Sequence, residues 1–168
     1  MFYENVAQRL KYHVKFTFFM DKSAFEVYNY LKEDELKTMY FDRRYTGTED
    51  DYFKELLTSG TIYVGNLSKK TTEAQLYTLF SQCGRIKRVI MGLDAKKYTP
   101  CGFAFVHFEK PEMSSLARKF FSKYMLGHLP LYIDLDSGFA ENRQFGRGVK
   151  GGQARDDFSD ISKKRRHV

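Results

Sequence analysis

Two short aromatic segments constrain the fold of this chain more than any other feature. They are residues 62–67 (Ile-Tyr-Val-Gly-Asn-Leu) and residues 101–108 (Cys-Gly-Phe-Ala-Phe-Val-His-Phe). Because side chains alternate between the two faces of a strand, the second segment places Phe103, Phe105 and His107 on one face and smaller apolar residues on the other. Tyr63 likewise points away from its apolar neighbours. Large rings opposite a core are typical of a surface that stacks flat ligands, and nucleic-acid bases are the commonest such ligands.

The two segments resemble the paired ribonucleoprotein motifs of the RNA recognition motif (RRM) family, whose longer motif runs basic-Gly-aromatic-Gly/Ala-aromatic-Val-x-aromatic. Cys101 stands where the family has Lys or Arg, which puts one phosphate contact in question. The pattern of residues 60–136 predicts an α+β, ferredoxin-like RRM of order β-α-β-β-α-β, a four-stranded antiparallel sheet backed by two helices. We expect the RRM over residues 60–137, an N-terminal extension over 1–59 and a Gly/Arg-rich C-terminal extension over 138–168.

Turn and capping signals set the expected boundaries. Thr72 with Gln75 forms a capping-box pattern for the first helix. The second helix is expected to begin at Pro111 and to end at Gly127. Strands are expected over 86–91 and 131–136, with a polar loop over 92–100. A helix is expected around 23–39, and the C-terminal extension is expected to become ordered only with an anionic ligand.

Composition narrows the function classes. A formal net charge of +7 and a pI near 9.3 suit a polyanionic partner, which leaves RNA, DNA and a membrane surface open. The two cysteines favour a reducing compartment over a disulfide scaffold. The apolar run 14–20 is too short to span a bilayer and has no signal-peptide cleavage site, so we expect neither a membrane protein nor a secreted one. With no metal-ligand spacing, phosphate-cradling loop or nucleophile–base pair, we expect no cofactor and no enzymatic activity. The basic run 163–166 reads equally as a nuclear import signal, an RNA contact or a solvated tail.

Two carboxylates distinguish the chain from a plain RNA-binding sheet. Asp134 and Asp136 are two residues apart on the last expected strand, while Ile133 and Leu135 suit the core side. Both acids therefore fall on the aromatic face. One carboxylate matches the two adjacent N–H donors on the edge of guanine. The alternative is ordinary solubility at the end of a strand.

Together with strings further along, these residues resemble the small subunit of the nuclear cap-binding complex. The resemblance covers about residues 38–158, with matching strings at 63–68, 91–94, 101–103, 134–139 and 143–153. It implies binding of the 7-methylguanosine cap of RNA polymerase II transcripts, together with a large helical scaffold subunit. It also implies a nuclear location, with shuttling to the cytoplasm as a further expectation.

The resemblance implies a role for each matching residue. The methylated base would stack between Tyr40 and Tyr63, in a pocket walled by Phe103 and Phe105. Asp136, with Asp134 and the backbone of Leu135, would bind the edge of the base. The residues expected to hold the triphosphate and the second nucleotide are Arg143, Arg147, Gln153, Ala154, Arg155 and Phe158, the last by stacking on the next base.

The chain also departs from the family pattern. Tyr132 replaces an arginine, Leu135 replaces a tryptophan, and the first forty residues exceed the usual extension. Tyrosines at positions 28, 30 and 45 compete with Tyr40 for the upper stacking position. Two alternatives therefore stay open, a generic single-stranded RNA-binding RRM and a protein-interaction RRM without cap specificity.

Overall fold

A computed structural model describes residue 42 and residues 45–157 of the chain. Tyr40, Phe158, the helix expected around 23–39 and the basic run 163–166 lie outside the described residues. The described elements are α3 (Glu49–Thr58), β1 (Thr61–Gly65), α4 (Glu73–Phe80), β2 (Ile86–Leu93), β3 (Pro100–Phe108), α5 (Pro111–Phe121), β4 (Met125–Leu126), β5 (Leu129–Pro130) and β6 (Tyr132–Asp136).

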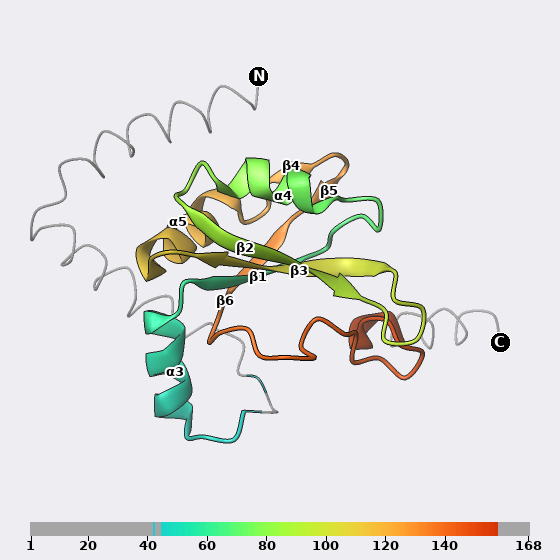
Figure 1. The fold of residues 1–168 in the computed structure, drawn as a ribbon, viewed down its shortest axis with the longest axis horizontal. Coiled ribbons are helices and arrows are strands. Elements are labelled where there is room, and N and C mark those ends of the chain that lie inside the picture. Colours follow the sequence, from blue (N-terminus) through green and yellow to red (C-terminus); the bar gives the residue numbers. More distant parts are fainter. Residues whose placement is uncertain (1–41, 43–44, 158–168) are drawn as a thin grey trace, which may run out of the picture.

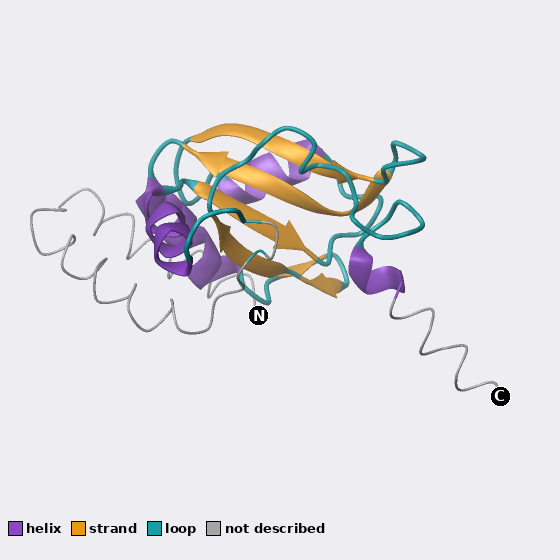
Figure 2. Ribbon diagram, turned by 90° about the horizontal axis from the view of Figure 1, so that it is seen from below, coloured by secondary structure: helices purple, strands orange, loops and turns teal. Residues whose placement is uncertain are grey.

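The main sheet has the strand order β2-β3-β1-β6, and each neighbouring pair is antiparallel. Helices α4 and α5 cover one face, while residues 138–157 run along the other (Figure 1). The view from below shows this loop segment lying across the strands (Figure 2). The arrangement confirms the predicted ferredoxin-like fold. Within the described residues, no helix is long and apolar enough to cross a membrane.

The hydrophobic core fills the space between the sheet and the two helices. Ile62 of β1 and Val106 of β3 are fully buried there, opposite Phe80 of α4 and Phe121 of α5. The rings of Phe80 and Phe121 meet edge to face, with centroids 5.5 Å apart. Burial of these side chains is the main stabilising contribution to the domain.

The start of α4 follows the predicted capping box. The backbone N–H of Gln75 donates to the Thr72 hydroxyl, and the backbone N–H of Thr72 donates to the Gln75 side chain at 2.9 Å. Two of the N–H groups that a helix leaves unpaired at its start are thereby satisfied. The local sequence thus fixes the start of α4, the helix that packs against β2.

The expected end of the second helix was wrong. α5 ends at Phe121, and Gly127, with φ +67°, lies in the turn of a small hairpin formed by β4 and β5. Lys123 has the left-handed φ of +66°, and its N–H donates to Leu131 O instead of continuing the helix. Tyr124 still packs against Phe121, with ring centroids 5.4 Å apart. The helical spacing of Tyr124 therefore reflects its contact with the core, although the residue lies outside the helix.

The C-terminal segment also changes the expected boundaries. The polar loop was expected from Gly92, yet β2 continues to Leu93. Leu93 N–H donates to Gln144 O, and Gly146 N–H donates to Leu93 O, each at 2.7 Å. Leu93 also pairs with Pro100 of β3, so the end of β2 lies between β3 and the segment that follows β6. Residues 138–157, expected to lack structure without an anionic ligand, instead lie against the sheet.

Candidate nucleic-acid interface

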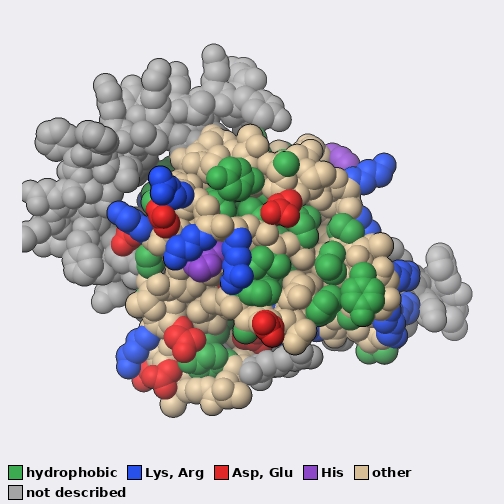
Figure 3. Space-filling model, viewed as in Figure 1, with side chains coloured by type: hydrophobic (Ala, Val, Ile, Leu, Met, Phe, Trp, Pro, Cys, Tyr) green, Lys and Arg blue, Asp and Glu red, His purple; other side chains and the backbone are tan. Residues whose placement is uncertain are grey.

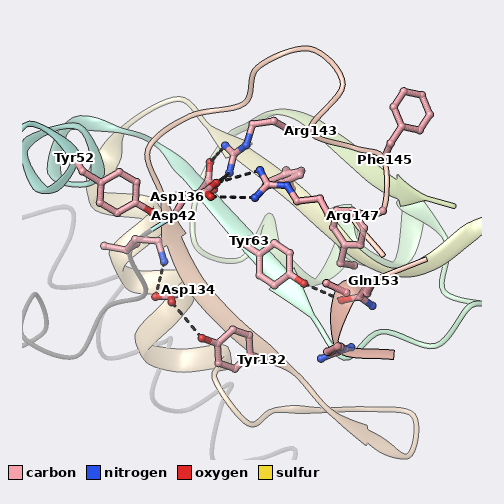
Figure 4. A pocket seen from close by; sticks show the side chains of 16 residues that line it. Asp42, Tyr52, Tyr63, Tyr132, Asp134, Asp136, Arg143, Phe145, Arg147 and Gln153 are labelled. Carbon is pink, nitrogen blue, oxygen red and sulfur yellow. Dashed lines mark hydrogen bonds and ion pairs between the residues drawn. The ribbon is translucent and has the colours of Figure 1, made fainter. Parts of the chain in front are cut away.

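A cavity of about 360 Å³ opens on the aromatic face of the sheet. β1, β3 and β6 supply its floor, and residues 143–155 supply one wall (Figure 4). Every predicted site residue that the structure describes lines it, namely Tyr63, Phe103, Phe105, Asp134, Leu135, Asp136, Arg143, Arg147, Gln153, Ala154 and Arg155. Residues far apart in the sequence thus converge on one space.

Tyr63 is the central ring of the floor. It lies nearly parallel to Phe103, with centroids 5.7 Å apart and an interplanar angle of 24°, and it meets Phe105 edge to face at 5.8 Å. Phe103 and Phe105 are only 5% and 4% exposed, whereas Tyr63 is half-buried. The two phenylalanines therefore support the tyrosine, and the tyrosine is the ring that a ligand would meet.

The hydroxyl of Tyr63 ties the floor to the wall. It donates to Gln153 Oε1 at 3.1 Å, and Gln153 Nε2 donates to Cys101 O at 2.7 Å. Burial raises the pKa of Tyr63 to about 12, so the phenol keeps its proton at neutral pH. Gly102 permits this approach, because a Cβ there would lie 2.9 Å from Leu67 O and 3.2 Å from Gln153 Nε2.

Asp136 forms a bidentate ion pair with Arg143. Two parallel N–H···O bonds of 2.7 Å join the guanidinium and the carboxylate, and Gly138 N–H donates a third at 3.0 Å. Burial disfavours the charge of Arg143, but bonding to Asp136 outweighs it and raises the arginine pKa. Arg143 also lies over the Phe105 ring at 5.0 Å. The two predicted contacts, base edge and phosphate, are therefore partners of one another.

Asp134 lies beside Tyr63 in the register of β1 and β6 and is held by groups from β6 and α5. Leu135 N–H donates to it at 3.0 Å, the Tyr132 hydroxyl donates at 3.2 Å, and Arg118 Nε of α5 lies 3.4 Å away. The Leu135 side chain is buried in the core, so only its backbone faces the cavity. Tyr132 and Arg118 together place a hydroxyl and a cation at this carboxylate.

Arg147 is paired with an acid that the sequence did not single out. Its guanidinium donates two bonds to Asp42, at 3.0 and 3.1 Å, and Arg143 lies 3.7 Å from the same carboxylate. Tyr52 of α3 also lines the cavity, and burial raises its pKa to about 12. Asp42 is part of the Tyr-Phe-Asp string at 40–42, but no sequence spacing connects it to Arg147. Among the described residues, no group of three or more His, Cys, Asp or Glu could hold a metal ion.

The fold and the aromatic, charged cavity define the class of protein. The RNA recognition motif family matches residues 62–132, so the chain contains an RRM domain. The nuclear cap-binding protein subunit 2 of Caenorhabditis elegans is 49% identical over 119 residues, which are 71% of this chain and 75% of that protein. The chain belongs to the nuclear cap-binding protein subunit 2 family.

Two further relatives bear the same name. The protein of Oryza sativa subsp. japonica is 50% identical over 119 residues, and that of Eremothecium gossypii is 50% identical over 130 residues. The matched segments are 71% and 77% of this chain, but only 49% and 56% of those relatives. This chain thus matches about half the length of these two proteins.

Proposed function

We propose that this chain binds the 7-methylguanosine cap of RNA polymerase II transcripts, as the small subunit of a heterodimeric nuclear cap-binding complex. The supporting observation is one cavity that combines a supported tyrosine ring, a buried carboxylate and arginines. The names of the relatives support the same function. The proposed partners are capped RNA and a large helical scaffold subunit. The proposed location is the nucleus, with shuttling to the cytoplasm, and the activity is binding without catalysis.

Tyr63 would hold the base. Methylation at N7 makes guanine cationic, so a ring beneath it adds cation–π attraction to stacking, on the order of 1–3 kcal/mol per stacked base. Phe103 and Phe105 fix the plane of Tyr63. Tyr40 would close the sandwich from the opposite side. Its position only two residues before Asp42, which lines the cavity, supports this assignment.

Asp136 would bind the edge of the base by exchanging partners. Guanine presents N1–H and the N2 amino group as two adjacent donors, and the guanidinium of Arg143 occupies the same two oxygens in the same way. A cationic base can therefore replace a cationic side chain without leaving the buried carboxylate unpaired. Asp134 and the Leu135 backbone would complete this contact.

The arginines would hold the triphosphate. Once displaced from Asp136, Arg143 can turn toward the phosphates, and Arg147 can do the same by releasing Asp42. Gln153, Ala154 and Arg155 line the same end of the cavity. Phe158 would stack on the second nucleotide. Acids then hold the cationic base while arginines neutralise the anionic phosphates.

The test is a fluorescence titration of the full chain with methylated and unmethylated cap dinucleotides, with and without a candidate large subunit. We expect a strong preference for the methylated form. Tyr63→Ala should weaken capped-RNA binding at least tenfold, about 1.4 kcal/mol, and Asp136→Ala should abolish the preference. The exposed Tyr77→Ala and Glu141→Ala, outside the cavity, are the matched controls.

Two results would contradict the proposal. Wild-type affinity in Tyr63→Ala would exclude the stacking role. Equal, weak binding of both dinucleotides with the large subunit present would favour a generic single-stranded RNA-binding module. Loss of the family arginine and tryptophan, at Tyr132 and Leu135, would then account for the missing cap specificity.

A further inference from the structure

Tyr98, in the loop between β2 and β3, is a bulky side chain in an unfavourable position. Its ring is 66% exposed, and its backbone has the left-handed φ of +56°. Glycine adopts this conformation without steric cost, whereas a bulky residue is an outlier there. Such outliers persist where the surrounding structure holds them, and they concentrate at ligand-binding sites.

The loop around Tyr98 is fixed by hydrogen bonds. The side chain of Asp94 accepts from the N–H groups of Lys96 and Lys97, both at 2.9 Å, and its carbonyl accepts from Tyr98 N–H at 2.8 Å. Ala95 N–H donates to Gly151 O at 2.8 Å, which joins the loop to the C-terminal segment. The exposed ring is thus presented from a fixed frame.

The position of Tyr98 connects it to the cavity. Its ring meets Phe145 edge to face, with centroids 5.8 Å apart. Phe145 lines the cavity, and Figure 4 shows it at the end beyond Arg147 and Gln153, with its ring pointing away from Tyr63. Phe145 therefore lies between Tyr98 and the end of the cavity where the triphosphate would bind.

The surroundings of Tyr98 are basic. Lys96 and Lys97 directly precede it in the sequence and are both exposed, and Lys96 Nζ donates to Val149 O at 3.0 Å. At this end of the molecule, Figure 3 shows hydrophobic side chains next to lysines and arginines. An exposed ring among cations is the combination that binds single-stranded nucleic acid, by stacking on a base and attracting its phosphate.

We propose that Tyr98 stacks on a base of the RNA downstream of the cap, with Lys97 attracting the adjacent phosphate. The proposal rests on the proposed function, because it requires the cap to occupy the cavity. It adds a subsite for the body of the transcript. Stacking tolerates any base, so the subsite extends the footprint on RNA without selecting sequence.

The test compares ligands of increasing length on the full chain, assembled with its large subunit if binding requires it. The ligands are 7-methylguanosine triphosphate and capped oligonucleotides of two to six nucleotides. Tyr98→Ala should leave binding of the triphosphate unchanged and weaken binding of the longest oligonucleotide five- to tenfold. Tyr98→Phe should retain wild-type affinity, as should the exposed Tyr77→Ala on α4.

Tyr98→Gly separates stacking from folding. Removal of the left-handed outlier should raise the thermal midpoint, while loss of the ring should weaken binding of the long oligonucleotide as in Tyr98→Ala. Equal affinity of wild type and Tyr98→Ala for every length would overturn the proposal. So would a loss confined to binding of the purified large subunit, which would mark Tyr98 as a protein contact. Failure of wild type to bind the triphosphate would instead refute the proposed cap function.

Discussion

The two faces of the sheet bury aromatic rings almost equally, yet they are built differently. Phe108 on the helix face is fully buried, and Phe105 on the cavity face is 4% exposed. Apolar side chains of α4 and α5 cover the first ring. The second lies under Arg143 and Phe139, in a segment held by ion pairs and hydrogen bonds. Burial alone therefore does not distinguish a core from a binding surface. The two faces differ in what covers the ring, which is apolar side chains on one face and a charged, hydrogen-bonded segment on the other.

Because the two faces are covered differently, substitutions on them should have different effects on stability and on binding. Removing apolar volume from the helix face leaves a cavity that packing cannot refill. The ion pairs and hydrogen bonds on the other face can be exchanged for a ligand, because a cationic group or an anion can take the place of one partner. Substitutions on the helix face should change stability first, and those on the cavity face should change binding first.

The largest effect on stability is expected from Phe80→Ala on the helix face. Phe80 is fully buried against Phe121, and its truncation should cost about 3–5 kcal/mol of unfolding free energy. Urea unfolding followed by circular dichroism measures the change. A loss below about 1 kcal/mol would mean that the helix face is no better packed than the loop-covered face.

The next effect concerns the ion pair of Asp136 and Arg143. Asp136→Asn or Arg143→Gln alone should cost about 2 kcal/mol of stability, because each leaves a largely buried charge without its partner. The double variant should cost less than the sum of the two single variants, since both charges are removed together. A double-mutant cycle from urea unfolding measures this coupling, and strict additivity would argue against it.

A smaller and opposite effect is expected from Asp42→Asn. Under the proposed function Asp42 would compete with phosphate for Arg147, so its neutralisation should strengthen binding of a triphosphate ligand two- to threefold, about 0.5 kcal/mol. The gain should decrease with added salt. Titration of 7-methylguanosine triphosphate at low and high salt measures it, with the exposed Asp50→Asn as control. Weaker binding would indicate that Asp42 orients Arg147 for the ligand.

The smallest effect is a pH dependence from His107, at the edge of the cavity face. Burial, with Lys87 and Arg88 nearby, lowers the pKa of this imidazole below its usual 6.5. As the pH falls, His107 is therefore protonated in the unfolded chain at a higher pH than in the folded chain. Stability is complete above pH 6.5 and declines as the pH falls toward the lower folded-state pKa. Thermal unfolding between pH 7 and 5 should show a shallower decline for His107→Gln than for wild type or the exposed His128→Gln.

Local patterns predicted the elements that depend on local physics. Strand alternation placed Tyr63, Phe105 and Asp134 on one face, because it has a fixed period of two residues. The capping box at Thr72 was correct for the same local reason. Gly127 was misplaced because core contact of Tyr124 persists after the helix ends, so the helical spacing continues beyond the helix.

The sequence did not predict which acidic residue pairs with which arginine. Resemblance to the cap-binding family placed Arg143 and Arg147 at the cavity, where the structure also has them. It did not indicate that Asp136 and Asp42 bind these arginines. Asp42 and Arg147 are 105 residues apart, and the chain between Asp136 and Arg143, which are seven apart, includes a turn of irregular backbone, so no periodicity relates either pair. The role of each residue in binding a cap stays a prediction.

The contacts that close the cavity have a consequence for biosynthesis. Tyr63 and Gln153 are 90 residues apart, and Asp42 and Arg147 are 105 apart. Contacts across such separations carry a larger loop-closure entropy and form slowly. A nascent chain that has left the ribosome through residue 136 already holds every strand of the sheet, but it lacks the wall. We therefore expect the domain to fold during translation, and a newly made molecule to become competent for RNA only once Gln153 has emerged.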